Sequence, residues 1–255
     1  MATSAERVRR ALRYDRINRA IERPFRREIM GLKNRYIDDQ LAFYKKNGRL
    51  STDLTNTLSG KMEKVFEKYQ GMAIRMAGAE TLKQVSVPKS TKPFELKAAS
   101  RWDYYLRVWA STNGGKNARA TAGTTFTDLS RLITAAFTAG EDESAVIRAG
   151  LRAKGYSAFR ADTVARTETH NAATFAAERT TEDLAAEVGV TMLKIWQPVL
   201  DERTRESHAA MINHPAIGMS EYFDVGGVEM DRPGDDDAPA EEVINCRCVC
   251  LYESA

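Results

Sequence analysis

The sequence predicts a mostly helical α+β protein: an extended N-terminal region, then a small C-terminal α+β domain with a long helix and a few short strands. Three observations carry this prediction. Apolar residues recur at helical spacing through the first half of the chain. An alanine-rich stretch over residues 159–187 stops before Gly189, a residue type typical of helix C-termini. Residues 190–196 and 243–252 are short apolar segments typical of strands.

The charge is unevenly distributed along the 255 residues, although the formal net charge is only +3. Residues 1–150 hold 28 Lys and Arg against 16 Asp and Glu, whereas residues 151–255 hold 10 against 19. We therefore predict two parts. Residues 1–150 form a basic, mainly helical region that contacts a partner or DNA, and residues 151–255 form an acidic α+β domain.

The first half is expected to contain several helices. Pro24 should kink or interrupt the first of them, because proline lacks the amide donor that a helix interior needs. A second helix, with capping candidates at residues 51–53, carries an apolar seam at 4-3-4-3-4 spacing. The seam consists of Leu58, Met62, Val65, Tyr69, Met72 and Met76. We interpret it as an internal helix pair, with an intermolecular coiled coil as the alternative.

The composition then becomes less regular. Residues 81–98 contain two prolines and four lysines and are predicted to be a linker. Short helices are predicted over residues 102–109 and 126–137. The Gly- and Asn-containing stretch 113–123 between them is predicted to be a flexible loop.

The first helical segment is rich in arginine. Such a helix suits contact with the phosphate backbone of DNA, or docking on an acidic protein surface, and a merely solvated face is the alternative. The residues are Arg7, Arg9, Arg10, Arg13, Arg16 and Arg19.

Glu168 is the first candidate in the C-terminal domain. It lies on the long helix, on the side of Val164 and Phe175 and away from His170. A carboxylate on an apolar stripe needs a cation to offset its desolvation, and Arg203 or Arg205 can supply one. We favour a structural buried pair over a catalytic acid or base.

Asp201 and His208 follow the first predicted strand. Asp201 is placed to cap a helical turn, and His208 lies about two turns further on. Together with Asp235 they could bind a divalent ion in a nuclease, which we keep as an alternative. The sequence contains no serine-nucleophile, phosphate-binding-loop or His-Glu-x-x-His motif.

All three cysteines lie in one five-residue stretch, at positions 246, 248 and 250. On a strand, alternate residues share a face, so the three thiols would point the same way. We expect core thiols; the alternative is a zinc site made by Cys246, Cys248 and Cys250, or by two of them with His208. An odd, clustered cysteine count is atypical of secreted disulfide frameworks.

No membrane segment or signal peptide is expected. The sequence has no run of about 18 apolar residues. Its N-terminus lacks the apolar core of a signal peptide and continues into a charged helical pattern. With the clustered cysteines, this predicts synthesis in a reducing cytoplasm.

Four sequence pieces in the second half occur in a distinctive order. They are Ala165-Arg-Thr-Glu168, Trp196 followed by Asp201-Glu-Arg-Thr-Arg-Glu-Ser-His208, Pro233-Gly234, and Ile244-Asn-Cys-Arg-Cys248. Over roughly residues 150–255 this series resembles the phage Mu F-like head morphogenesis family, found in minor head proteins of tailed bacteriophages. The chain departs from the family after His208, where Met211-Ile-Asn-His214 replaces a Leu-x-Gly-like turn.

The resemblance implies a structural, non-enzymatic minor head protein of the virion, present in several copies and associated with the portal or major capsid protein and with packaged double-stranded DNA. It carries no established reaction and no certain cofactor. The family's motif positions fall on Glu168, Asp201, Arg203, Arg205, His208, Cys246 and Cys248. We expect the first five of these to form a polar framework. The alternatives are a metal-dependent nuclease or toxin-like enzyme, and a zinc-stabilised binding module.

Overall fold

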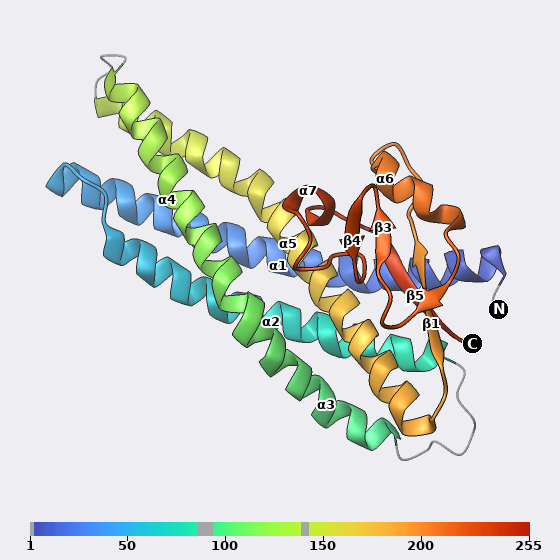
Figure 1. Cartoon of the computed structure of the whole chain (residues 1–255). Coiled ribbons are helices and arrows are strands. Elements are labelled where there is room, and N and C mark those ends of the chain that lie inside the picture. Colours follow the sequence, from blue (N-terminus) through green and yellow to red (C-terminus); the bar gives the residue numbers. More distant parts are fainter. Residues whose placement is uncertain (1–2, 86–93, 139–142) are drawn as a thin grey trace. The chain divides into compact units, whose positions relative to one another are not determined.

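The computed structural model describes residues 3–85, 94–138 and 143–255 (Figure 1). The long helices are α1 (Ser4–Asn47), α2 (Thr52–Gln84), α3 (Phe94–Trp109), α4 (Gly115–Thr138) and α5 (Glu143–Val188). A π-helical turn, η1 (Ala110–Gly114), joins α3 to α4. The short helices are α6 (Glu206–Ala209), the 3₁₀ turn η2 (Ala210–Asn213) and α7 (Ala240–Val243).

Strands occur in the C-terminal part, which confirms the mostly helical α+β class. They are β1 (Met192–Gln197), β2 (Ile217–Gly218), β3 (Phe223–Val225), β4 (Val228–Met230) and β5 (Val249–Ser254). One antiparallel sheet has the order β2-β1-β5, with Trp196 opposite Cys250, and β3 pairs with β4 in a hairpin. The predicted end of the long helix is confirmed, because Gly189 follows α5 with φ +67°. The predicted start at residue 159 is wrong, because α5 begins at Glu143.

The helices and strands form two compact units that do not follow the chain order. The first unit contains residues 1–21, 69–109 and 166–255, and the second contains residues 22–68 and 110–165. The boundary predicted at residue 150 lies within α5. A division of function between the basic and acidic segments remains a prediction.

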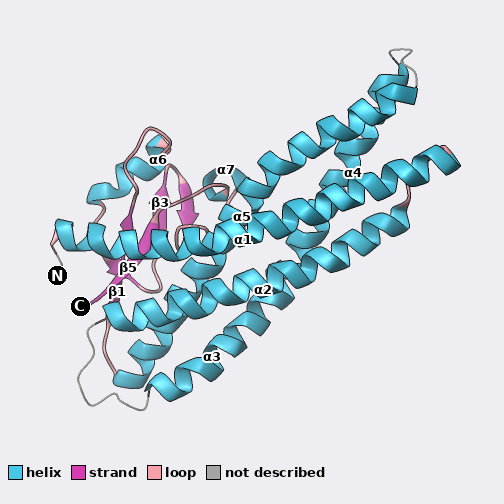
Figure 2. Cartoon of the chain, turned by 180° about the vertical axis from the view of Figure 1, so that it is seen from behind, coloured by secondary structure: helices cyan, strands magenta, loops and turns pink. Residues whose placement is uncertain are grey.

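In the first unit, the N-terminal turns of α1 run alongside the sheet (Figure 2). Arg7 and Arg10 form ion pairs with Glu253 of β5, at 3.6 and 3.9 Å. The Tyr14 hydroxyl is hydrogen-bonded to Thr81 of α2 at 2.7 Å. Segments far apart in the sequence therefore share one core.

The second unit consists of helices and their connections in its described residues, with no strand among them. Phe25 of α1 packs edge-to-face on Phe66 of α2, with ring centroids 5.2 Å apart. Arg26 of α1 forms an ion pair with Asp162 of α5 at 2.7 Å. Apolar packing and surface ion pairs thus join helices that are distant in sequence.

The helix predicted after Ser51 is α2, and the Ser51 hydroxyl accepts a hydrogen bond from the Leu54 amide, as an N-cap does. The predicted seam is only partly right. Met72 and Met76 are 37% and 40% exposed, and Val65 is half-buried. The buried positions of this helix drift around it, as expected for a straight helix of 3.6 residues per turn. They are Leu58, Met62, Phe66, Tyr69, Gln70, Gly71, Ala73, Ile74, Ala77, Gly78 and Thr81.

The predicted interruption at Pro24 is wrong, because α1 continues through it. Ile21, Phe25 and Ile29 are fully buried on both sides of the proline. Their burial at four-residue spacing stabilises the helix by more than the missing amide hydrogen bond costs.

The loop predicted over residues 113–123 is also wrong. Ala118 and Ala122 are buried inside α4, where their small side chains allow close packing. The glycines at 114 and 115 mark only the junction between η1 and α4. Residues 86–93 of the predicted linker lie outside the described residues, but the prediction is wrong for residues 81–84 and 94–98, which are helical in α2 and α3.

The strand predicted over residues 243–252 is shorter and begins later. Residues 240–243 form α7, residues 246–248 have no regular structure, and β5 begins at Val249. Among the described helices, none is apolar over enough of its length to cross a membrane.

Candidate functional site

The four-residue segment Asn245–Cys248, between α7 and β5, is the point where three predicted motif pieces meet. Asn245 has a left-handed backbone with φ 59°. Its side-chain oxygen accepts a hydrogen bond from Arg166 at 2.9 Å, and its amide donates to Thr167 at 3.1 Å. The segment is thereby fixed to the Arg-Thr-Glu stretch of α5.

Arg247 makes the second connection. Its guanidinium donates two hydrogen bonds of 2.6 Å to the two carboxylate oxygens of Asp201, in the turn after β1. This bidentate pair holds the pKa of Asp201 well below its usual range, and the backbone amide of Arg203 contributes another hydrogen bond. Arg205 donates to the backbone carbonyl of Ile244 at 2.6 Å. The Asp201 turn and the segment 245–248 are therefore joined at several points.

His208 makes the third connection, from α6. Its Nδ1 lies 3.4 Å from the Cys248 Sγ and 3.6 Å from the Cys246 Sγ. The imidazole and both thiols are buried, with at most 2% of each residue exposed. Within the described residues, these three are the group of His, Cys, Asp or Glu side chains arranged closely enough to hold a metal ion.

The other side of the His208 ring is fixed as well. Nε2 lies 2.8 Å from a carboxylate oxygen of Glu242 on α7, and that oxygen also accepts from Ser207 at 3.3 Å. The ring packs edge-to-face on Trp196 at 5.4 Å. Packing and hydrogen bonding thus give the imidazole one orientation.

The electrostatics of the cluster favour a thiolate. A hydrogen bond from Cys246 lowers the pKa of the Cys248 thiol well below its usual range, against the effect of burial, and His208 acts in the same direction. The same contact raises the pKa of Cys246. Burial lowers the pKa of His208, but its contacts with Cys248 and Glu242 outweigh burial, and the net shift is upward.

Cys250 does not join the cluster, which corrects the expectation that all three thiols share one face. It lies in β5 opposite Trp196, and burial raises the pKa of its thiol to about 12. The prediction assumed a strand over all three cysteines, but Cys246 and Cys248 precede the strand, where side chains need not alternate. The thiol of Cys250 is that of a core residue.

The framework predicted from Glu168, Asp201, Arg203, Arg205 and His208 remains a prediction as a whole, and the contacts described for its members differ from the expected Glu168–arginine pair. Glu168 is 8% exposed and accepts a hydrogen bond from Gln70 of α2 at 2.8 Å. The two predicted cations contact other groups, because Arg203 pairs with Asp201 and Arg205 with a carbonyl. Asp201, Arg205 and His208 are connected instead through residues 244–248.

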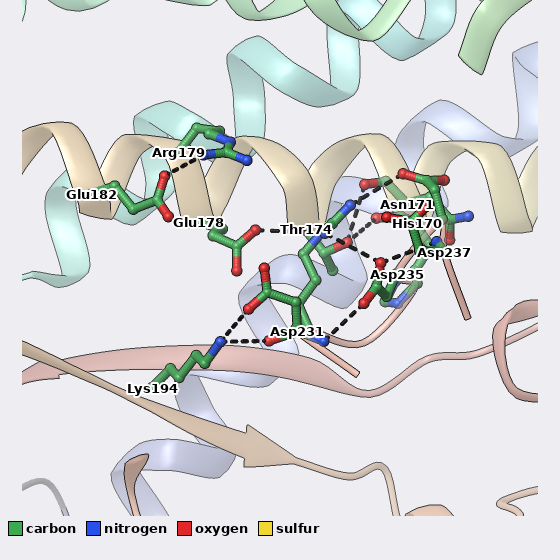
Figure 3. Close-up of polar contacts among 12 residues, drawn as sticks. His170, Asn171, Thr174, Glu178, Arg179, Glu182, Lys194, Asp231, Asp235 and Asp237 are labelled. Atoms are coloured by element: carbon green, nitrogen blue, oxygen red, sulfur yellow. Dashed lines mark hydrogen bonds and ion pairs between the residues drawn. The ribbon is translucent and has the colours of Figure 1, made fainter. Parts of the chain in front are cut away.

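A second buried polar cluster centres on Arg232, in the loop after β4. Figure 3 labels its neighbours Glu178 and Asp235. Arg232 is 6% exposed, and its guanidinium forms ion pairs with Glu178 of α5 at 3.5 Å and with Asp236 at 3.1 Å. Asp235 lies 3.9 Å away and accepts hydrogen bonds from the amides of Asp231 and Asp237. The acidic run of the sequence therefore folds around one arginine.

Two carboxyls of this cluster are hard to ionise. Burial raises the pKa of Glu178 to about 7 and that of Asp236 to about 6, although Arg232 lowers both. Neither oxygen of Glu178 has a hydrogen bond among the described residues, so the charges of Arg232 and, more weakly, Lys194 offset its desolvation. Burial and Arg232 also lower the pKa of the neighbouring His170 to about 4.

The nuclease alternative needs Asp201, His208 and Asp235 around one ion. The structure gives them separate partners: Arg247 for Asp201, two cysteines and Glu242 for His208, and two backbone amides for Asp235. His214, in the segment that departs from the family, packs on Phe223 at 5.5 Å.

The N-terminal arginines differ in their contacts and in their exposure. Arg7 and Arg10 contact Glu253, and Arg13 contacts Glu80 at 3.4 Å. Arg9, Arg13, Arg16 and Arg19 are exposed on α1. Arg7, Arg10 and Arg13 therefore attach the N-terminal turns of α1 to other segments of the first unit.

Sequence reasoning missed Glu242, Glu178 and Arg232 as site residues. A single arginine beside three consecutive aspartates signals a locally neutralised loop, so Arg232 could have been found. No comparable pattern marks Glu178 or Glu242, since each acquires its role only when distant segments come together.

Residues 127–251 match the family model described as Phage Mu protein F like protein. The match begins earlier than the motifs indicated, within α4, and contains all of α5. No curated protein and no solved structure matches the chain. The match includes the residues that meet at segment 245–248, and the region 127–251 is therefore a phage Mu F-like region, which connects this chain with phage head morphogenesis.

Proposed function

We propose that this chain is a structural minor head protein of a tailed bacteriophage, acting at or near the portal and the packaged DNA. The observation that carries the proposal is the Mu F-like match over residues 127–251, together with the way its motif residues are used. In the structure these residues bond to one another across α5, the Asp201 turn and the end of α7. Such mutual bonding suits a rigid assembly module.

The shape of the cluster also favours a structural role. The cavity beside His208, Cys246 and Cys248 has a volume of about 10 Å³. That volume holds about one water molecule and no organic substrate. A Cys–His pair in this setting has no room to attack a peptide or a nucleotide.

The test locates the protein in particles. Heads of the source phage are purified and crosslinked, and the crosslinked peptides are identified by mass spectrometry. We expect a few copies of this chain per head, with crosslinks to the portal or the adjoining capsid subunits. Absence of the chain from mature heads and from their assembly intermediates would contradict the proposal. So would DNA cleavage by the purified protein with magnesium or manganese that disappears on Asp201→Ala.

The exposed face of α1 is the proposed contact with a neighbour. Arg9, Arg13, Arg16 and Arg19 lie within about 120° of the helix circumference at 100° per residue. Val8 and Leu12 lie on the same side and are 45% and 48% exposed. Apolar side chains among cations favour an acidic protein surface over a phosphate backbone, which offers nothing to bury them.

Charge reversal tests this contact. In the double variant Arg9→Glu/Arg16→Glu we expect incorporation into heads to fall by about tenfold, because like charges then face the acidic neighbour. Arg131→Glu/Arg152→Glu makes the same change in net charge elsewhere and should incorporate normally. Equal losses in both variants would contradict a specific role for α1. If the first variant instead loses salt-sensitive retention of duplex DNA and incorporates normally, DNA is the neighbour.

A further inference from the structure

The distances in the His208 cluster match the edges of a metal coordination tetrahedron. Zinc binds sulfur at about 2.3 Å and imidazole nitrogen at about 2.0–2.1 Å, so tetrahedral angles place N and S ligands about 3.6 Å apart. The two N–S distances here are 3.4 and 3.6 Å. All three ligand atoms lie within 4.8 Å of one another. Both N–S distances therefore match those around a tetrahedral zinc ion, and the two sulfurs lie close enough to share it.

The surroundings of His208 match a zinc-bound histidine. Metal-binding histidines usually donate their second ring N–H to a carboxylate or carbonyl, which fixes the tautomer and the ring orientation. With Nε2–H donating to Glu242 at 2.8 Å, the Nδ1 lone pair points towards the two thiols. The carboxylate at Nε2 therefore favours the tautomer that metal binding requires, with the Nδ1 lone pair free for the ion.

We propose that His208 Nδ1, Cys246 Sγ and Cys248 Sγ bind one zinc ion. Two thiolates and a neutral imidazole are soft and borderline ligands, which select zinc over magnesium or calcium. The cavity of about 10 Å³ beside the cluster leaves the fourth position to one water-sized ligand. The residues lining that cavity include no other histidine, cysteine or carboxylate.

The ion would fasten α6 to the segment before β5. Both cysteines belong to segment 245–248, which also carries the contacts to α5 and to the Asp201 turn. A structural zinc ion contributes its binding free energy to folding. Its removal should therefore loosen the junction of all three motif pieces.

Metal content gives the direct test. The full-length protein is purified without an affinity metal, and zinc is measured by emission spectrometry. We expect about one zinc per chain in the wild type and at least about a fivefold loss in Cys246→Ser and Cys248→Ser. Two matched controls should keep the metal: Cys250→Ser, which removes the third buried thiol, and His214→Ala, which removes a histidine outside the cluster. Less than about 0.2 zinc per wild-type chain would overturn the proposal.

A second measurement uses only the wild type and does not depend on how variants fold. The chelated protein is titrated with cobalt(II), and the near-ultraviolet thiolate-to-cobalt charge-transfer absorption is recorded. We expect saturation at one cobalt per chain, displacement by zinc, and recovery of the melting temperature lost on chelation. Absence of thiolate absorption, or a native disulfide between Cys246 and Cys248, would also overturn the site. A zinc-free protein that still enters heads would leave the head-protein proposal intact.

Discussion

Arg232→Met is expected to destabilise the first unit by about 3–5 kcal/mol, because it removes the cation from a buried cluster and leaves carboxylates behind. The side chain is 7% exposed and lies against Glu178 and Asp236, which are 1% and 23% exposed. It also lies over the Phe175 ring at 5.7 Å. Methionine keeps most of the aliphatic volume, so the loss is chiefly electrostatic.

The loss of folding stability caused by Arg232→Met should depend on pH in a defined direction. The folded-state pKa values of Glu178 and Asp236 are raised to about 7 and about 6. Near pH 5 both carboxyls are largely protonated, and the loss of Arg232 costs less. Near pH 8 both are ionised in the wild type, and without the arginine they must be protonated or remain as buried charges. The destabilisation should therefore grow as the pH rises from 5 to 8.

Denaturant unfolding at the two pH values measures this effect, with hydrogen exchange of β1 and β5 amides reporting on the first unit. Arg203→Met is the matched control, since that side chain is 66% exposed and should change stability by less than about 1 kcal/mol. Equal costs for the two variants would contradict the structural role of Arg232. So would a cost that falls as the pH rises.

Gly234→Ala is the second variant with a large expected effect. Gly234 has φ +74°, and a Cβ added there would lie 2.6 Å from the Asn171 side-chain oxygen and 3.1 Å from the His170 ring. Asn171 is buried and hydrogen-bonded to Asp236, so it cannot easily move away. The alanine therefore adds backbone strain and forces apart the loop and α5, at a total cost of about 3 kcal/mol or more.

Gly227→Ala separates the two contributions. Gly227 has a similar backbone, with φ +88°, but no atom lies within 4 Å of an added Cβ. It should lose only about 1–2 kcal/mol from strain. Thermal and denaturant unfolding of both variants give the difference, which we expect to exceed about 1 kcal/mol. Equal stability of the two variants would mean that the loop does not pack on α5 as described.

Local signals in the sequence predicted the elements that depend on local physics. Gly189 ends α5, Ser51 caps α2, and the apolar stretch after Gly189 forms β1. The interruption at Pro24 was wrong because burial of Phe25 and its neighbours outweighs the local cost of proline. Composition suggested a loop over residues 113–123, whereas close packing of Ala118 and Ala122 makes it helical.

The candidate site was predictable in part. His208, Cys246 and Cys248 were all singled out from the sequence, and the structure brings them together. The prediction that the Cys250 thiol points the same way as the other two was wrong, because it required a strand over residues 246–248. Glu242 and Glu178 carry no local signal, since their roles depend on segments that meet only in the folded chain. Tertiary contacts alone give these two residues their roles in the site.

The first unit is built from three separate stretches of the chain, which affects how it can fold during synthesis. Arg7 and Arg10 are translated long before their ion-pair partner Glu253. Asn18 likewise contacts His170 at 3.5 Å, across 152 positions. Contacts this distant close late and slow folding. The N-terminal turns of α1 therefore cannot form these contacts until β5 has been translated. During that interval the nascent chain is exposed to misassembly.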